Sequence, residues 1–307
     1  MVCICVVSSK ICCTRKYIDA AVPDLLLQKL RTRVDLNKVK SIGGAAQNAT
    51  VWWAQESSAQ LASLSPQQSL HTQLGTAKTF ALLHTPSPHD ASTATQAQAI
   101  EAAIGGPDGM AHRVGTAAHA SLAAAQAMKV REGNPEAWAR TARGGRLSLA
   151  SAFVATLFLG RWAALGVAEV SGTGMWNAQL RQWDEPTLEI VAGSSEGGRT
   201  LKEMLGAVQL DPGRKLGTIA PYFVERYGFD PGMHSLSLIF PHNSLSIPRD
   251  VYYPLHVRPP RDVPIIMSHF FRLYHFVWLN GRSPHRRIAL SSNEALQSFP
   301  PSRTRSL

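Results

Sequence analysis

The sequence predicts a folded α/β chain in which short β-prone runs alternate with helices. Of its 307 residues, 45% are hydrophobic and 17% are charged, a composition that is typical of globular rather than disordered proteins. The chain is also long enough to bury the core of one large domain or two ordinary ones. Helical spacing and capping residues alternate with β-branched and aromatic runs along most of its length.

Helices are predicted where apolar residues recur at helical spacing or where capping residues mark an end. Asn134 comes before Pro135 as an N-cap comes before a first-turn proline, and Asp184 can cap a following helix. Gly105-Gly106 and Gly228 are expected to end helices. Residues 147–159 are apolar on nearly all sides, which predicts a buried helix. The predicted helices span residues 22–33, 95–104, 117–131, 147–159, 184–191 and 217–227.

Strands are predicted for three short runs. Residues 39–42 lead into Gly43-Gly44, residues 51–53 combine a valine with two tryptophans, and residues 236–240 read as a buried strand. Residues 55–80 are rich in Gln, Ser and Ala and are expected to form a surface insertion. Composition therefore places the regular elements on both sides of a polar stretch.

The net charge of +10 lies at the two ends of the sequence. Residues 1–40 hold 8 Lys/Arg and 3 Asp/Glu, residues 241–307 hold 9 Arg and 3 Asp/Glu, and the middle holds 14 against 15. Nine of the 19 prolines also fall in residues 241–307. A basic excess can mark a nucleic-acid or anionic partner. Here it marks the ends, without a nucleic-acid-binding motif, so nucleic acid is not the expected partner.

Cysteine usage and hydropathy narrow the class further. All four cysteines lie in the first thirteen residues, so a disulfide framework is not expected, and no metal ligand set stands at a fixed spacing nearby. The longest apolar run, residues 147–160, is shorter than the ~20 residues of a membrane span. The start lacks the basic and long apolar regions of a signal peptide. The sequence predicts a cytoplasmic protein with no metal site of its own and no membrane partner, and it leaves the oligomeric state open.

Six segments of the sequence, taken in order, resemble the motifs of one known family. Residues 44–53 resemble its Gly-Gln-Gln-His-Gly-Ser-Val-Tyr-Trp segment, and Asn-Pro-Glu-Ala matches at residues 134–137. Further matches are Asp-Ser-Ser-Thr at residues 90–93, Glu-Ala-Ala-Val-Gly-Gly at 101–106, a buried helix at 147–160 and Tyr-Tyr-Val-Gln-Arg-Tyr-Gly-Phe at 222–229. By these segments the sequence resembles eukaryotic xylulose kinases of the FGGY carbohydrate kinase family, over residues from about 22 to 240.

The resemblance implies an actin-like, ribonuclease H-like ATPase fold, of which this chain holds an incomplete first FGGY domain with a degraded or missing second domain. It divides the chain into an unmatched Cys-rich segment (1–21), a partial N-terminal FGGY-type domain (22–240) and a basic Pro/Arg-rich tail (241–307). It also implies ATP-dependent phosphorylation of D-xylulose, with ATP and Mg²⁺ as cofactors. Such a transfer needs in-line positioning and a carboxylate near the attacking hydroxyl.

Residues that the resemblance assigns to the sugar site are only partly kept. Asn48 replaces the sugar-contacting His, and Ser121 replaces an Arg of that site. Asn48 equally suits a turn, and residues 117–128 suit a helix packed in the core better than a sugar site. The predicted sugar-binding residues are Gln47, Asn48, Asp90, Gln126, Asn177 and Asn243.

The family's catalytic Asp is missing from the segment at residues 169–177. Glu169 is the nearest carboxylate and is the candidate for its catalytic role. On a strand, alternation would direct Glu169 to the side of Ser171 rather than of Gly172. At the family's Thr-Gly-Asp-Asn segment, His242 stands where Asp is expected and Asn243 survives. The phosphate loop and the adenine-binding glycines have no counterpart in the sequence.

The missing motifs predict a truncated and catalytically impaired member of the family. The alternative is a non-catalytic interaction protein or pseudokinase with a basic tail. The abrupt change in composition after Phe240 also motivates the hypothesis of a shifted reading frame or a mistaken exon boundary. Transcript sequencing across the codons for residues 230–250 tests it, because a continuous, unshifted transcript that encodes the tail would contradict it.

Overall fold

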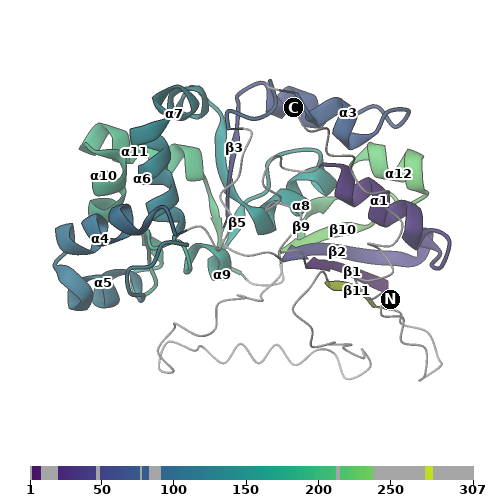
Figure 1. The fold of residues 1–307 in the computed structure, drawn as a ribbon. Helices are drawn as coiled ribbons and strands as arrows, with labels where there is room; N and C mark the ends of the chain where they lie inside the picture. Colours follow the sequence, from purple (N-terminus) through teal and green to yellow (C-terminus); the bar gives the residue numbers. More distant parts are fainter. Residues whose placement is uncertain are drawn as a thin grey trace, which may run out of the picture.

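A mixed sheet and a group of helices form the two sides of the molecule, with strand β3 between them (Figure 1). The structure is a computed structural model that describes residues 2–7, 20–45, 49–76, 78–82, 91–211, 215–237 and 274–278. Its α/β character agrees with the prediction from the sequence.

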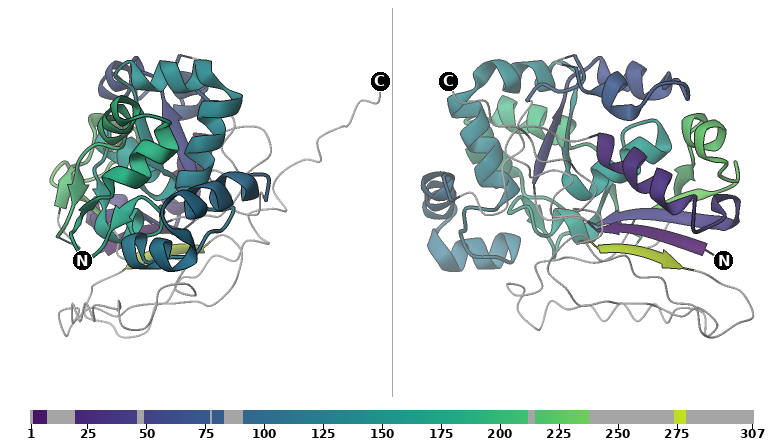
Figure 2. Two further views of the ribbon diagram at one scale, coloured as in Figure 1. Left: turned by 90° about the vertical axis from the view of Figure 1, so that its left-hand side faces the viewer. Right: turned by 45° about the vertical axis from the view of Figure 1, so that its right-hand side comes forward.

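The largest sheet has five strands in the order β11-β1-β2-β10-β9. Strands β1 (Val2–Val7), β2 (Val39–Ala45) and β10 (His234–Ser237) run parallel, whereas β11 (Tyr274–Trp278) and β9 (Lys215–Thr218) pair antiparallel at the two edges. In the right-hand view of Figure 2, β11, β1 and β2 lie next to one another below α1. Backbone from both ends of the sequence thus joins the sheet built on residues 39–45.

Two of the predicted strands are confirmed and a third is shifted. The strand expected at residues 39–42 extends to Ala45, and the one expected at 51–53 is β3 (Thr50–Trp53). The run expected at 236–240 begins two residues earlier, as β10, and residues 238–240 lie outside the described part.

Helices α1 (Ala21–Leu30), α8 (Ala150–Leu159) and α12 (Pro221–Tyr227) cover one face of this sheet (Figure 1). Every side chain of α8 is buried, as predicted. The predicted start of this helix at residue 147, however, is wrong, because Arg146–Leu149 form strand β4, which pairs antiparallel with β3. The helix expected from Gly217 likewise begins at Pro221, because residues 215–218 pair with β10. Strand pairing with a distant partner overrides local helix propensity in both places.

The expectation of a surface insertion at residues 55–80 is wrong. This stretch forms α2 (Ser57–Ala62) and α3 (Leu70–Leu74), and Leu61, Leu70 and Leu74 are at most 1% exposed. They belong to the same core as the buried face of α8. Within these helices the apolar side chains face the core, Ser58, His71 and Thr72 are exposed, and Ser57 is buried.

Within the described residues, the other side of the molecule is a group of six helices, which lie together in Figure 1. Gly105 and Gly106, both at positive φ, connect two helices rather than only ending the first. The second of these helices, and a further helix at residues 195–205, are not predicted from the sequence. The helix expected from residue 117 begins at Ala123. The six are α4 (Ala94–Ala103), α5 (Gly106–Val114), α6 (Ala123–Gly133), α7 (Pro135–Ala142), α10 (Glu185–Ala192) and α11 (Ser195–Leu205).

The predicted caps are confirmed. The Asn134 side chain accepts a hydrogen bond from the Ala137 N–H, and Asp184 does the same for Thr187. Asp184 also receives two hydrogen bonds from the Arg113 guanidinium, at 3.1 and 3.0 Å, which tie α5 to the start of α10. Gly228 ends α12 at φ 76°, a conformation that suits glycine.

The remaining elements are short. A 3-10 turn (Leu36–Lys38) leads into β2. Strand β5 (Leu165–Gly166) pairs with β8 (Val208–Gln209), and β6 (Trp176–Asn177) pairs with β7 (Gln182–Trp183). The one-turn helix α9 (Val167–Val170) follows β5 directly.

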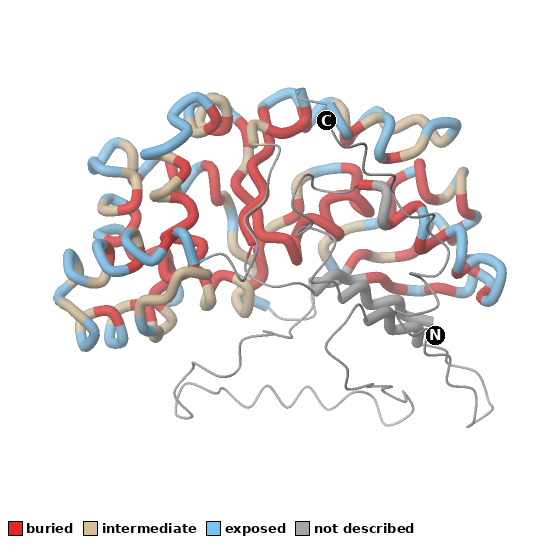
Figure 3. Tube along the Cα trace, in the orientation of Figure 1, coloured by how far each residue is buried: buried red, intermediate tan, exposed pale blue. Residues whose placement is uncertain are grey.

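Two main hydrophobic clusters meet along β3 and α8. Figure 3 shows both elements as nearly continuous buried backbone. Trp53 and Phe153 belong to the cluster beside the sheet, whereas Trp52 and Ala152 belong to the cluster of the helical group. Because β3 alternates its side chains between the two, it joins them.

Candidate functional site

Three segments converge where the helical group meets the sheet. They are the start of β3, the start of α6 and the turn of residues 171–175 that follows α9. The Ala124 N–H donates to the Thr173 carbonyl at 3.0 Å, and the Ala150 N–H donates to the Ala49 carbonyl at 2.9 Å. The turn contains the residues that resemble the family's catalytic segment, so this junction is the candidate site.

Gln126 has both ends of its amide in use inside the protein. It is 2% exposed. Its Oε1 atom accepts from the Thr50 N–H at 3.1 Å and from the Thr50 hydroxyl at 3.0 Å, while Nε2 donates to the Ser121 carbonyl at 3.3 Å. Gln126 therefore links β3 to the start of α6. These contacts account for a buried glutamine on an alanine-rich helix without a ligand.

Glu169 lies in the helical turn α9, not on a strand, so the expected strand alternation is wrong. Its Oε2 atom accepts from the Gly166 N–H at 2.5 Å, which is half of a capping box, and its carboxylate also bonds to the Ser151 side chain. Burial raises the pKa of Glu169, and these two hydrogen bonds oppose that rise. The carboxylate thus fastens α9 to the first turn of α8.

Replacing Glu169 by Gln is expected to change how stability depends on pH. The raised pKa means that the folded state binds this proton more tightly than the unfolded state. Stability therefore falls as pH rises from about 4.5 through the raised pKa of the folded protein. Glu169→Gln lacks this decline, so its free energy of unfolding should be at least that of the wild type at pH 8 and should lose any advantage near pH 5. Urea unfolding at pH 5 and pH 8 measures both.

Glu136→Gln is the matched control, because Glu136 is exposed in the first turn of α7. Its stability difference from the wild type should vary little between the two pH values. If the stability of Glu169→Gln relative to the wild type increased as the pH fell toward 5, the assigned direction of the pKa shift would be contradicted.

Asn177 stabilises the turn between β6 and β7. Its Oδ1 atom accepts from the Gln179 N–H at 3.1 Å and from the Leu180 N–H at 3.0 Å. The residue is 9% exposed. This is the local side-chain-to-backbone bonding for which Asn is favoured in turns. The structure thus gives Asn177 a role in the hairpin.

Four of the predicted sugar-binding residues lie outside the described part of the chain. They are Gln47, Asn48, Asp90 and Asn243. The described residues Ala49 and Thr50 lie at the junction, where Ala49 accepts from the Ala150 N–H and the Thr50 N–H donates to Gln126. Residues Ala91–Thr93 lead into α4, beside the loop before α6.

The loop before α6 holds a pair of polar side chains that the sequence analysis did not identify as a site. His119 Nδ1 and Ser121 Oγ are 2.8 Å apart, and both residues are half-buried. Burial lowers the pKa of His119, so its imidazole is neutral at pH 7. In the sequence, Ser121 is notable only because it replaces the family's Arg, and no local pattern indicates a role for His119.

The described residues contain neither a metal-binding cluster nor a membrane-spanning helix. Among them, no three His, Cys, Asp or Glu side chains gather where they could hold a metal ion. Glu169, the carboxylate nearest to the turn in the sequence, already bonds to Gly166 and Ser151. The residues at the junction therefore do not fit a Mg²⁺-ATP site by themselves. In the described part, no helix is long and apolar enough to span a bilayer.

The architecture defines a class of protein: an α/β chain with the actin-like ATPase fold of the FGGY sugar kinases. A crystal structure of ligand-bound xylulose kinase from Lactobacillus acidophilus superposes with a TM-score of 0.52 at 13% identity, over 71% of this chain and 38% of that one. No protein-family model matches the sequence.

Two curated relatives are more similar in sequence. Probable D-xylulose kinase A of Aspergillus terreus is 36% identical over 210 residues, which are 68% of this chain and 36% of the relative. Xylulose kinase of Schizosaccharomyces pombe is 35% identical over 252 residues, 80% of this chain and 42% of the relative. The chain belongs to the FGGY carbohydrate kinase family. It spans about two fifths of the length of these relatives.

Proposed function

We propose that this chain is a D-xylulose-binding member of the xylulose kinases with impaired phosphoryl transfer. The observation that carries the proposal is the junction of β3, α6 and the 171–175 turn in a chain that is 36% identical to a D-xylulose kinase. The Ala124–Thr173 and Gln126–Thr50 hydrogen bonds hold together segments that the resemblance assigns to one sugar site. A rigid junction of this kind supports binding of a small polar substrate.

The carboxylate chemistry supports the impairment. Phosphoryl transfer to a sugar hydroxyl uses a carboxylate within hydrogen-bond reach of that hydroxyl. The turn after α9 reads Ser171-Gly172-Thr173 and carries no acid, and the nearby Glu169 is bonded to Gly166 and Ser151. By resemblance, an intact site of this family would use ATP together with Mg²⁺. Whether this chain binds ATP and Mg²⁺ is tested together with its activity.

The test measures sugar binding and turnover separately. D-xylulose is titrated into the full chain by calorimetry, and ADP release is followed by a coupled assay with D-xylulose and Mg-ATP. We expect D-xylulose to bind, while ADP release stays at the level without sugar. Sugar-dependent ADP release that Glu169→Ala abolishes would show an active enzyme with Glu169 as its base. Absence of D-xylulose binding would overturn the proposal.

A second candidate is a non-catalytic interaction protein whose basic tail contacts acidic surfaces. The observation that favours it is the charge of residues 241–307, with 9 Arg against 3 Asp/Glu. We propose residues 241–307 as a basic tail that follows the FGGY-type domain (22–240), although β11 within it pairs with β1 of the Cys-rich start (1–21). Binding to DNA that weakens steeply with salt and is lost on deletion of 241–307 would support this function.

A further inference from the structure

We propose that His119 and Ser121 form a hydrogen-bonded pair that binds hydroxyl groups of the sugar. The inference rests on the proposed function, because it concerns the same junction and adds two residues to it. The pair lies in the loop between α5 and α6, a few residues before Ala124, whose N–H reaches the Thr173 carbonyl. It is thus close in sequence and in space to the turn that defines the candidate site.

The loop that carries the pair is held from several sides. Three side chains bond to the backbone of the loop: one from α6, one from α4 and one from the N-cap residue of α4. One further hydrogen bond joins two backbone groups within the loop. The bonds are Ala118 N–H to Glu101 Oε2 at 3.0 Å, the Thr93 hydroxyl to the Ala120 carbonyl, Gln126 Nε2 to the Ser121 carbonyl at 3.3 Å, and Leu122 N–H to the His119 carbonyl at 3.2 Å. Buried or half-buried side chains thus fix the backbone on both sides of His119. A loop held in this way loses little entropy when a ligand binds.

The pair offers one donor and one acceptor in either tautomer of the imidazole. If the Ser121 hydroxyl donates to Nδ1, the Nε2–H remains a donor and Ser121 Oγ remains an acceptor. If Nδ1–H donates to Ser121, Nε2 becomes the acceptor and the hydroxyl becomes the donor. Within the described part of the chain, His119 Nε2 has no hydrogen-bond partner. Sugar hydroxyls both donate and accept, so a donor beside an acceptor matches a polyol.

The neutrality of the pair selects the class of ligand. Burial lowers the pKa of His119, which keeps the imidazole uncharged at pH 7. Among the described residues, the ionisable group bonded to this loop is Glu101, and its bond goes to the Ala118 backbone. An uncharged pair of this kind gives no Coulombic attraction for a phosphate. It therefore fits the unphosphorylated ketopentose better than a phosphorylated sugar.

The experiment measures D-xylulose affinity in the full chain for His119→Ala, Ser121→Ala and His112→Ala. The last variant is the matched control, because His112 is exposed on α5. Loss of one neutral hydrogen bond should weaken binding about 3- to 10-fold in each of the first two variants and leave the control unchanged. In parallel, proton–nitrogen NMR spectra follow the His119 ring, whose signals are assigned by their loss in His119→Ala. They should shift when D-xylulose is added to the wild type.

The outcomes separate the inference from the function on which it rests. If the wild type binds D-xylulose but both variants bind it equally well and the ring signals stay fixed, the pair is overturned and the proposed function stands. If the wild type does not bind D-xylulose, both are overturned. If His119→Ala does not fold, the D-xylulose affinity of Ser121→Ala decides the matter, and an affinity equal to that of the wild type overturns the pair.

Discussion

Asp24→Asn should lower the free energy of unfolding by about 3 kcal/mol, because the Asp24 carboxylate accepts hydrogen bonds from three separate groups in the protein interior. Asp24 lies in α1 and is 3% exposed. Its Oδ2 atom accepts from the Leu70 N–H at 2.7 Å, and its Oδ1 atom accepts from the hydroxyls of Tyr222 at 2.9 Å and Tyr227 at 2.6 Å. An asparagine presents only one acceptor oxygen to these donors, so at least one of them loses its partner.

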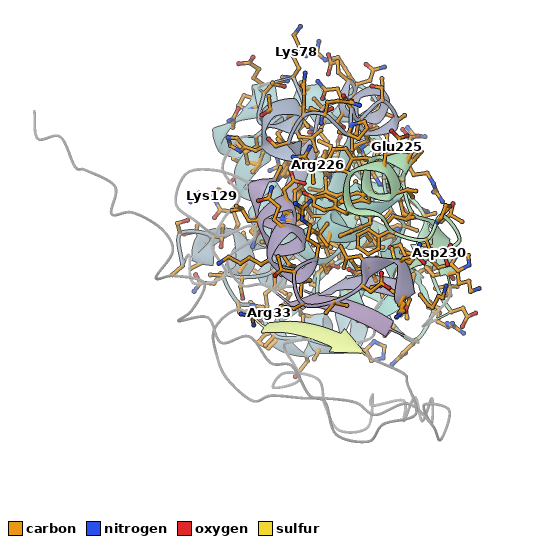
Figure 4. All side chains as sticks on the ribbon, turned by 90° about the vertical axis from the view of Figure 1, so that its right-hand side faces the viewer. Arg33, Lys78, Lys129, Glu225, Arg226 and Asp230 are labelled. Carbon is orange, nitrogen blue, oxygen red and sulfur yellow. The ribbon has the colours of Figure 1, made fainter. Side chains whose placement is uncertain are left out.

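The groups around Asp24 join elements that are far apart in the sequence. Tyr222 and Tyr227 belong to α12, and Leu70 begins α3. Figure 4 shows Arg226 on the side of α12 that faces α1; its Nη1 donates to the Pro66 carbonyl at 2.6 Å, and its guanidinium lies 5.9 and 5.7 Å from the two tyrosine ring centres. Burial and the Asp24 carboxylate raise the pKa of Tyr227 to about 12, so its hydroxyl keeps its proton and remains a donor near neutral pH.

Urea unfolding of Asp24→Asn and of Asp35→Asn measures the effect. Asp35 is an exposed carboxylate that bonds to the Asn37 N–H and forms a surface ion pair with Lys38, so its replacement should cost under about 1 kcal/mol. Equal stability losses in the two variants would show that the Asp24 network contributes no more than a surface contact.

Trp53→Ala is expected to destabilise the chain by about 3–5 kcal/mol through loss of burial and the cavity that it leaves. The Trp53 side chain is fully buried, with ring centres 4.8 Å from Phe80 and 5.6 Å from Phe153. Its Nε1–H donates to Ser148 Oγ at 2.8 Å, across the β3–β4 pair. Trp53→Phe keeps an aromatic ring but leaves the buried Ser148 without that donor, so about 1–2 kcal/mol should be lost.

The matched control for Trp53 is Trp138→Ala. Trp138 is half-buried in α7 and packs on Trp52 at 5.8 Å, so less apolar surface is lost on truncation. Thermal and urea unfolding should rank Trp53→Ala as the less stable of the two variants. The reverse order would mean that the helical group, rather than the β3–α8 core, limits the stability of the molecule.

Local signals in the sequence were sufficient for much of the fold. Asn134 and Asp184 cap helices because their side chains bond to N–H groups three residues on, a contact that depends only on neighbouring residues. The same holds for Gly228, which ends α12. The ordered series of family-like segments between about 22 and 240 also predicted the actin-like fold that the comparisons show.

Contacts between distant residues were outside the reach of such signals. Residues 147–149 are as apolar as the rest of their run, and only the pairing with β3 makes them a strand. The composition of residues 55–80 predicts a polar surface, yet Leu61 in α2 and Leu70 and Leu74 in α3 are buried in the core. Burial depends on what packs against a segment, so composition alone gave the wrong answer there.

The candidate site divides in the same way. The sequence by itself determined the family and showed that the 171–175 turn contains no acid. The tertiary structure decided what the remaining polar residues do: Gln126 bonds to Thr50, Glu169 to Gly166 and Ser151, and His119 to Ser121. The physical reason is that a polar side chain gives up its hydrogen bonds with water on burial, and only the folded chain determines which partner replaces them.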